Sequence, residues 1–143
     1  MNVSNVKVKL NNDVMEKLNK SADRAMELTA NAIVSDIVSR AVVPKDVGTL
    51  ERGNDAIKSG YVEKINDMVY AIIYNTPYAR RWYFNLSFTD VNGKEHKPAT
   101  FQKTKNANAQ DHWMEHYFDG DGKQFVIDTY MKFWKEESGG IIK

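Results

Sequence analysis

An apolar stripe with the period of an α-helix is the clearest pattern in the chain. Apolar residues recur at steps of three and four positions, at Val14, Leu18, Ala22, Ala25, Leu28, Ala32, Ile33 and Ile37. Such steps place side chains on one face of a helix. Asp13 and Glu16 have the spacing of an acidic capping box. The pattern predicts a helix of about seven turns that ends near Arg40 and packs closely on a sheet through its small residues.

Three segments have features of β-strands. Val6, Val8 and Leu10 alternate with lysines, which is typical of a short strand with one solvated face. Residues 68–74 are rich in β-branched and aromatic side chains and are apolar on both faces, which predicts a central strand. Residues 54–65 are mixed and are compatible with a further strand.

The segment after Pro77 is aromatic and leads into a polar region. Residues 78–88 form another aromatic-rich stretch, of which residues 78–84 fit the edge strand of a sheet. Asn92-Gly93 predicts the tip of a hairpin with a type I′ turn. Residues 96–110 are polar and lack a period, which predicts a long loop. We expect a mobile loop at about residues 85–110.

The C-terminal part predicts two helices and an α+β fold. A short helix is expected over residues 111–118, followed by a glycine break and a final helix over residues 123–137. The final helix should bury Phe125, Val126, Tyr130, Phe133 and Trp134, and residues 138–140 should fray. Helices separated from strands along the chain predict a single α+β domain over residues 1–143. Its long N-terminal helix and C-terminal helices should pack on one face of a small antiparallel sheet.

Composition narrows the function classes. The net charge of +1 argues against a protein whose entire surface attracts nucleic acid. Residues 54–105 carry 8 basic and 5 acidic groups, whereas residues 106–143 carry 4 basic and 7 acidic groups. Because these two parts have opposite net charge, they could pair between copies of the protein. The absence of cysteine excludes disulfides and thiolate sites. No secretory signal pattern or long apolar run is present, so we expect a soluble protein made in the cytoplasm.

Metal chemistry and catalysis have little support. His112 and His116 lie four residues apart on a predicted helix, and with Asp119 they could hold zinc. The zinc-protease pattern requires glutamate after the first histidine, where this chain has Trp113. The segment after Asp119 also lacks ligands of a calcium loop. We therefore expect surface histidines, no metal, no cofactor and no enzymatic activity.

Two adjacent arginines lie among aromatic residues just after Pro77. Arg80 and Arg81 are flanked by Tyr78 and Trp82. This composition is typical of sheet cores, of protein–protein hot spots, and of surfaces that stack on nucleic-acid bases. All three interpretations remain open from composition alone.

Three short segments resemble one protein family. Pro44, Asp46, Gly48 and Leu50 resemble the Pro-x-Asp-Thr-Gly-x-Leu signature of minor structural proteins of long-tailed bacteriophages, although Val47 stands where threonine is commonest. Tyr78 and Ala79 resemble a second family segment. Asn106-Ala107-Asn108-Ala109 followed by Trp113 resembles a third, typical of phages of Gram-positive hosts. The ordered set covers most of residues 10–137.

The resemblance implies a virion component made in the bacterial host cytoplasm. Such a minor capsid, head–tail joining or tail-completion protein acts as a ring subunit in the phage neck and docks on connector, neck or tail proteins. We expect contacts through Arg80, Arg81 and Trp82, and through Asn92 and Lys94 in the long loop. The alternative is a nucleic-acid-binding module that uses the basic, aromatic middle segment.

Overall fold

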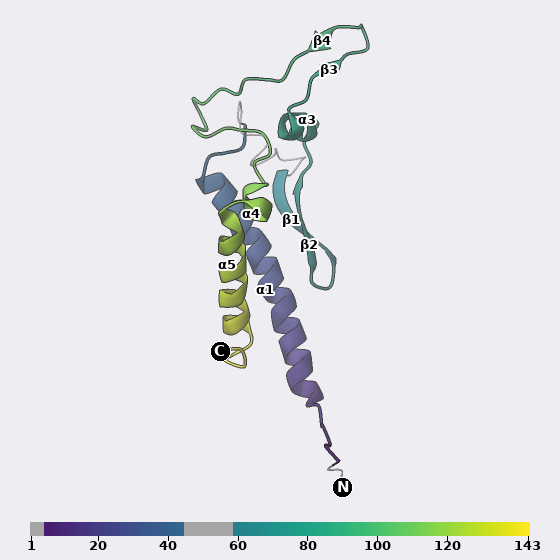
Figure 1. The fold of residues 1–143 in the computed structure, drawn as a ribbon, viewed down its shortest axis with the longest axis vertical. Coiled ribbons are helices and arrows are strands. Elements are labelled where there is room, and N and C mark those ends of the chain that lie inside the picture. Colours follow the sequence, from purple (N-terminus) through teal and green to yellow (C-terminus); the bar gives the residue numbers. More distant parts are fainter. Residues whose placement is uncertain (1–4, 45–58) are drawn as a thin grey trace.

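A 28-residue helix, α1 (Asn12–Ser39), forms the axis along which the other elements are arranged (Figure 1). The computed structural model describes residues 5–44 and 59–143. After α1 come β1 (Ser59–Asn66), β2 (Val69–Tyr74), α3 (Ala79–Phe84), β3 (Phe88–Thr89), β4 (Glu95–His96), α4 (His116–Asp119) and α5 (Gly122–Glu137). The predicted α+β fold is confirmed, with a long N-terminal helix, C-terminal helices and small antiparallel sheets.

The N-terminal helix has nearly its predicted length, but its capping residue is not the one predicted. Asn11 is the N-cap, and its side chain accepts a hydrogen bond from the Val14 backbone N–H. Ala25 and Ile37 are fully buried, as the apolar stripe predicts, whereas Val14 is exposed. The buried face also includes Thr29, whose hydroxyl donates to the Ala25 carbonyl at 2.7 Å. This bond within the helix allows a polar residue to be buried at low cost.

A hairpin of β1 and β2 packs against α1. Asp23 on the helix accepts hydrogen bonds from the Lys64 ammonium (2.7 Å), the Met68 backbone N–H (2.7 Å) and the Tyr70 hydroxyl (3.0 Å). The hydrogen bond from Lys64 is the main cause of the lowered pKa of Asp23. One carboxylate thus ties the helix to both strands and to the turn between them.

The prediction that residues 68–74 form a central strand is wrong. Strand β2 begins at Val69 and, among the described strands, pairs only with β1, in a two-stranded antiparallel sheet. Met68 instead lies in the turn with φ 62°. The described strands form two separate two-stranded sheets, so β2 has a sheet edge despite its apolar sequence.

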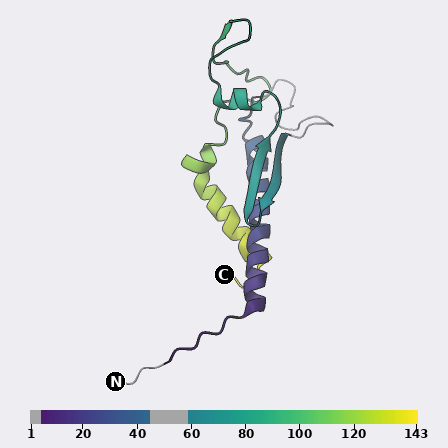
Figure 2. The ribbon, with the colours of Figure 1, turned by 90° about the vertical axis from the view of Figure 1, so that its right-hand side faces the viewer.

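Helix α5 packs along α1, which separates it from the β1–β2 hairpin (Figures 1 and 2). The Trp134 indole N–H donates to Ser21 Oγ at 3.2 Å. The predicted bounds of this helix are nearly those observed, but Phe125 is 37% exposed rather than buried. The predicted frayed end is wrong as well: Ser138 is fully buried, and its hydroxyl accepts from the Ile142 backbone N–H.

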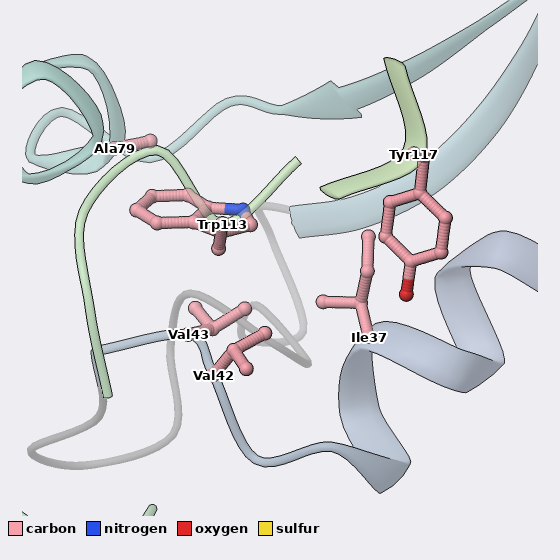
Figure 3. Packing of buried hydrophobic residues seen from close by; sticks show 6 residues of the cluster. All are labelled: Ile37, Val42, Val43, Ala79, Trp113 and Tyr117. Carbon is pink, nitrogen blue, oxygen red and sulfur yellow. The ribbon is translucent and has the colours of Figure 1, made fainter. Parts of the chain in front are cut away.

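The apolar core lies at the C-terminal end of α1. It consists of Ile37, Val42, Val43, Ala79, Trp113 and Tyr117. Figure 3 shows the Trp113 ring between Ala79 of α3 and the two valines that follow α1. The Tyr117 hydroxyl donates to Asp36 at 2.6 Å, and burial is the main cause that raises its pKa to about 12. The core thus joins α1, α3 and the chain around α4.

The predicted long loop is present, and its second half is attached to the core. No helix or strand occurs between β4 and α4. The backbone N–H groups of Asn108 and Gln110 donate to the carbonyls of Ala41 and Val42. The Asn106 side chain donates to the Val43 carbonyl at 2.8 Å. Residues 106–110 are therefore anchored, and mobility over residues 85–110 remains a prediction.

Two further predictions of local structure are wrong. The helix expected over residues 111–118 is only α4, because His112 has φ 46°, which does not fit a helix. Residues 5–10 form no strand within the described part of the chain. They extend away from the start of α1 (Figures 1 and 2), and Val6 and Val8 are 84% and 80% exposed.

Candidate docking surface

Residues 78–84, which fit a strand edge by sequence, contain the short helix α3 instead. At the start of this helix, the Ala79 backbone N–H donates a hydrogen bond to the Thr76 carbonyl. Ala79 is buried, and Tyr83 lies one turn later and packs edge-on against Trp113 with ring centroids 4.9 Å apart. Burial is the main cause that raises the pKa of Tyr83. The helical period leaves Arg80, Arg81 and Phe84 exposed.

Asn85 fixes the end of α3 and holds the returning loop. It adopts a left-handed conformation with φ 47°, and its backbone N–H donates to the Arg81 carbonyl at 2.8 Å. Its side-chain oxygen accepts from the Ala99 N–H at 2.7 Å, and its Nδ2 donates to the Ala99 carbonyl at 3.0 Å. Nδ2 also lies 3.3 Å from an Asp111 carboxylate oxygen. One side chain therefore joins α3 to both ends of the segment between residues 99 and 111.

Asn85→Gly and Asn85→Ala should both destabilise the protein, and alanine should have the larger effect. Glycine loses the side-chain hydrogen bonds, at a cost of about 1–2 kcal/mol in the free energy of unfolding. Alanine adds the steric cost of positive φ, about 1 kcal/mol more. Urea denaturation measures both values. Equal stability of the two variants would show that the left-handed conformation carries no cost.

An open groove of about 580 Å³ lies beside the exposed face of α3. We call it the α3 groove, and its lining consists of Pro77, Arg80, Arg81, Phe84, Leu86, Ser87 and Phe88. Leu86 is 70% exposed, and Phe84 and Phe88 are also exposed. Arg80 and Phe84 additionally line a smaller hollow of about 220 Å³ above Trp113. The surface thus combines apolar side chains with two cations, a composition suited to a protein partner.

The β3–β4 hairpin extends this surface. The Arg81 guanidinium lies over the Phe88 ring, 4.4 Å from its centroid, and the other side of the hairpin presents His96 stacked on Phe88 at 4.6 Å. Asp90 holds the turn, because one carboxylate oxygen accepts from the Asn92 and Lys94 backbone N–H groups. The hairpin prediction is confirmed. Its turn is not type I′, since Gly93 has positive φ but Asn92 does not.

The hairpin should lose order when Asp90 is protonated. Hydrogen bonds from His96 (3.0 Å) and from the turn backbone lower the pKa of Asp90 below 3.8, with the His96 bond as the largest cause. The stabilising contribution is therefore complete above pH 3.8 and is lost as pH falls through the lower, folded-state pKa. Backbone amide NMR shifts of Asn92 and Lys94 measure this. Asp90→Asn should remove the pH-dependent step, and a step that persists would assign it to another group.

The structure places the predicted site residues in several different environments. Arg80 and Arg81 line the α3 groove, and Asn92 and Lys94 lie exposed at the hairpin tip. Trp82 is half-buried between the core, Phe101 and Tyr78, which stacks on it at 6.2 Å. The family-motif residues Pro44, Ala79 and Trp113 are buried. Asp46, Gly48 and Leu50 lie outside the described residues.

Sequence reasoning missed several residues of this surface. Phe84, Leu86 and Phe88 line the groove, and Asn85 positions it. The aromatic and apolar composition of the segment was the available signal for the first three. Nothing in the sequence pattern indicated Asn85, because its role depends on contacts with residues 14 and 26 positions away.

The two histidines considered for metal binding do not share a helix face. His112 precedes α4 and lies 3.1 Å from an Asp111 carboxylate oxygen, whereas His116 is the first residue of α4 and packs on Tyr117. Within residues 5–44 and 59–143, no three side chains of His, Asp or Glu are grouped to hold a metal ion. None of the helices described is long and apolar enough to cross a membrane.

Comparisons of the chain with protein-family models, with curated proteins and with solved structures find no match.

Proposed function

We propose that this protein is a structural subunit of a phage virion that acts in head–tail joining by docking, without catalysis. The observation that carries the proposal is the α3 groove. The groove begins in the segment that resembles the phage family, and it combines Arg80 and Arg81 of that segment with exposed apolar side chains that follow it. Exposed apolar residues grouped around arginine are typical of protein–protein contacts.

The attachment of α3 to the rest of the protein supports a role in docking. Ala79 and Tyr83 attach α3 to the core, and Asn85 attaches it to the returning loop. A surface held on both sides loses little conformational entropy when it binds. In the proposed function, the buried motif residues Pro44 and Trp113 maintain the core. The arginines and apolar residues that line the α3 groove contact neck or connector proteins.

The ring arrangement follows from the resemblance to neck proteins. Subunits of a closed ring contact each other through two different surfaces, one on each side. A docking surface at one end of an elongated molecule leaves the flank of α1 and the β1–β2 hairpin for neighbouring copies (Figure 2).

Peptide mass spectrometry of purified, DNA-filled particles from the encoding organism tests the virion assignment. We expect peptides of this chain to be retained in the purified particles together with those of known virion proteins. The matched control is a cytoplasmic host protein of similar abundance, which should be removed by purification. If the chain is depleted together with that control, it is not a virion component.

Nucleic-acid binding is the second candidate. Arg80 and Arg81 are exposed, and the exposed Tyr78 ring stacks on Trp82 beside them. Cations next to an aromatic stack can hold a single-stranded nucleic acid. In that case DNA affinity would fall steeply with salt, and Arg80→Ala/Arg81→Ala would reduce the salt dependence by about two phosphate contacts. Affinity that is weak and unchanged in this variant would eliminate the alternative.

A further inference from the structure

Two depressions of the surface meet at α3 and share two lining residues. One is the α3 groove, and the other is the hollow of about 220 Å³ above Trp113. Arg80 and Phe84 line both of them. Because the two depressions have these side chains in common, a single bound segment can occupy both at once.

The hollow above Trp113 has the size and lining to receive one apolar side chain. Its lining includes Ile72, Tyr83, Trp113 and Met114, and Arg80 is its one charged residue among the described lining residues. Pockets that hold drug-sized molecules have volumes of about 300–1,000 Å³. The hollow is smaller than these pockets and opens to solvent, so a side chain that projects from a larger partner fits it better than a free small molecule does.

The charge of this surface is positive and unmatched among the described residues. The described linings of the groove and of the hollow contain no aspartate or glutamate. Within that part of the chain, no salt bridge joins Arg80 or Arg81 to a carboxylate. The Arg81 guanidinium lies over the Phe88 ring. Arg80, at the boundary of both depressions, is therefore the cation best placed for a carboxylate from a partner.

We propose that the α3 groove and the hollow together bind an acidic, apolar segment of the partner protein. One apolar side chain of that segment enters the hollow, a second lies in the groove, and a carboxylate between them pairs with Arg80. The inference rests on the proposed function, which gives this surface a protein partner, and it adds the chemistry of that partner. Nucleic acid would supply an anion for Arg80 but has no apolar side chain for the hollow.

Fluorescently labelled synthetic peptides test this chemistry on the folded protein. Each peptide has glutamate at its centre and one leucine on each side. The leucines lie two positions away in the first peptide, which suits an extended segment, and three and four positions away in the second, which suits a helix. The matched peptides carry lysine in place of glutamate. Fluorescence anisotropy then measures the Kd of each peptide at concentrations up to about 1 mM.

We expect the glutamate peptide of at least one spacing to bind about tenfold more tightly than its lysine counterpart. Arg80→Glu should reverse this preference, because the charge at the boundary of the two depressions is then negative. Arg80 is exposed, so the change removes no core contact. Lys132→Glu makes the same change of charge on an exposed residue of α5 and should leave the preference as it is.

The tryptophan indole N–H resonances in NMR spectra show whether the hollow is filled. Trp113 lines the hollow, whereas Trp134 lies where α5 packs on α1 and donates to Ser21. We expect the bound peptide to shift the Trp113 resonance and to leave the Trp134 resonance unchanged. A bound peptide that leaves the Trp113 resonance in place would show that the hollow is not part of the binding surface.

Three results with the peptides would overturn the proposal: equal affinity for the glutamate and lysine peptides, a preference that Arg80→Glu does not alter, or no binding of any peptide at about 1 mM. A single-stranded oligonucleotide that binds more tightly than every peptide at physiological salt would also overturn it, in favour of nucleic acid. The virion assignment is tested separately. A chain that is retained in purified particles but fails these tests is a virion protein that docks through other chemistry.

Discussion

Trp113→Ala is expected to lower the free energy of unfolding by about 3–5 kcal/mol. Trp113 is 1% exposed and is the largest fully buried side chain of the described residues. Its ring packs edge-on against Tyr74 at 5.5 Å and Tyr83 at 4.9 Å. Alanine would leave a cavity where the end of α1, α3 and the long loop meet. Urea denaturation followed by far-ultraviolet circular dichroism measures the change.

Trp113→Phe is the matched control for this prediction. The indole nitrogen has no hydrogen-bond partner among the described residues, so phenylalanine loses volume but no hydrogen bond. We expect it to cost less than half as much as alanine. A loss below about 1 kcal/mol for Trp113→Ala would place the stabilising core elsewhere.

Arg80→Glu/Leu86→Ser should greatly reduce virion assembly while leaving the fold intact. Both residues line the α3 groove and are exposed, so neither change removes a core contact. Loss of two hot-spot side chains, at about 2 kcal/mol each, weakens docking roughly a thousandfold. Complementation of a phage that lacks this gene, scored as infectious particles, measures the effect. Circular dichroism of the purified variant verifies that it folds.

The same two chemical changes on α5 are the control for the groove variant. Lys132 and Ile127 are exposed on that helix, away from α3. We expect Lys132→Glu/Ile127→Ser to complement nearly as well as the unmodified chain. An equal loss of infectivity with both double variants would show that the α3 groove has no specific role.

The sequence predicts the long elements well and the short ones poorly. The stripe from Leu18 to Ile37 repeats over many turns, so α1 is predictable from its period alone. Helix α3 has only six residues, whose aromatic side chains favour a strand. It is helical because Ala79 and Tyr83 must both reach Trp113, a contact that no local pattern contains.

The position of a strand within a sheet is likewise outside local information. The apolar faces of β2 predict a central strand with a partner on each side. Among the described strands, β2 has one partner, β1. Residues 5–10 have the opposite discrepancy, since their alternation predicts a strand but they pair with none of the described strands.

The candidate surface was partly predictable from composition. Arg80 and Arg81 stand out among aromatic residues, and both line the groove. Trp82 belongs to the same motif but is half-buried against Phe101 and the core. Only the helical period of α3 decides which side chains of the motif face solvent, and that period was not evident from the sequence.

Immunogold electron microscopy of particles from the encoding organism, with antibody against this chain, tests the central claim most directly. The proposed function predicts gold at the junction of head and tail. Particles without label, in preparations where a known capsid protein is labelled normally and the chain is also missing from denatured particles, would contradict a structural role in the virion.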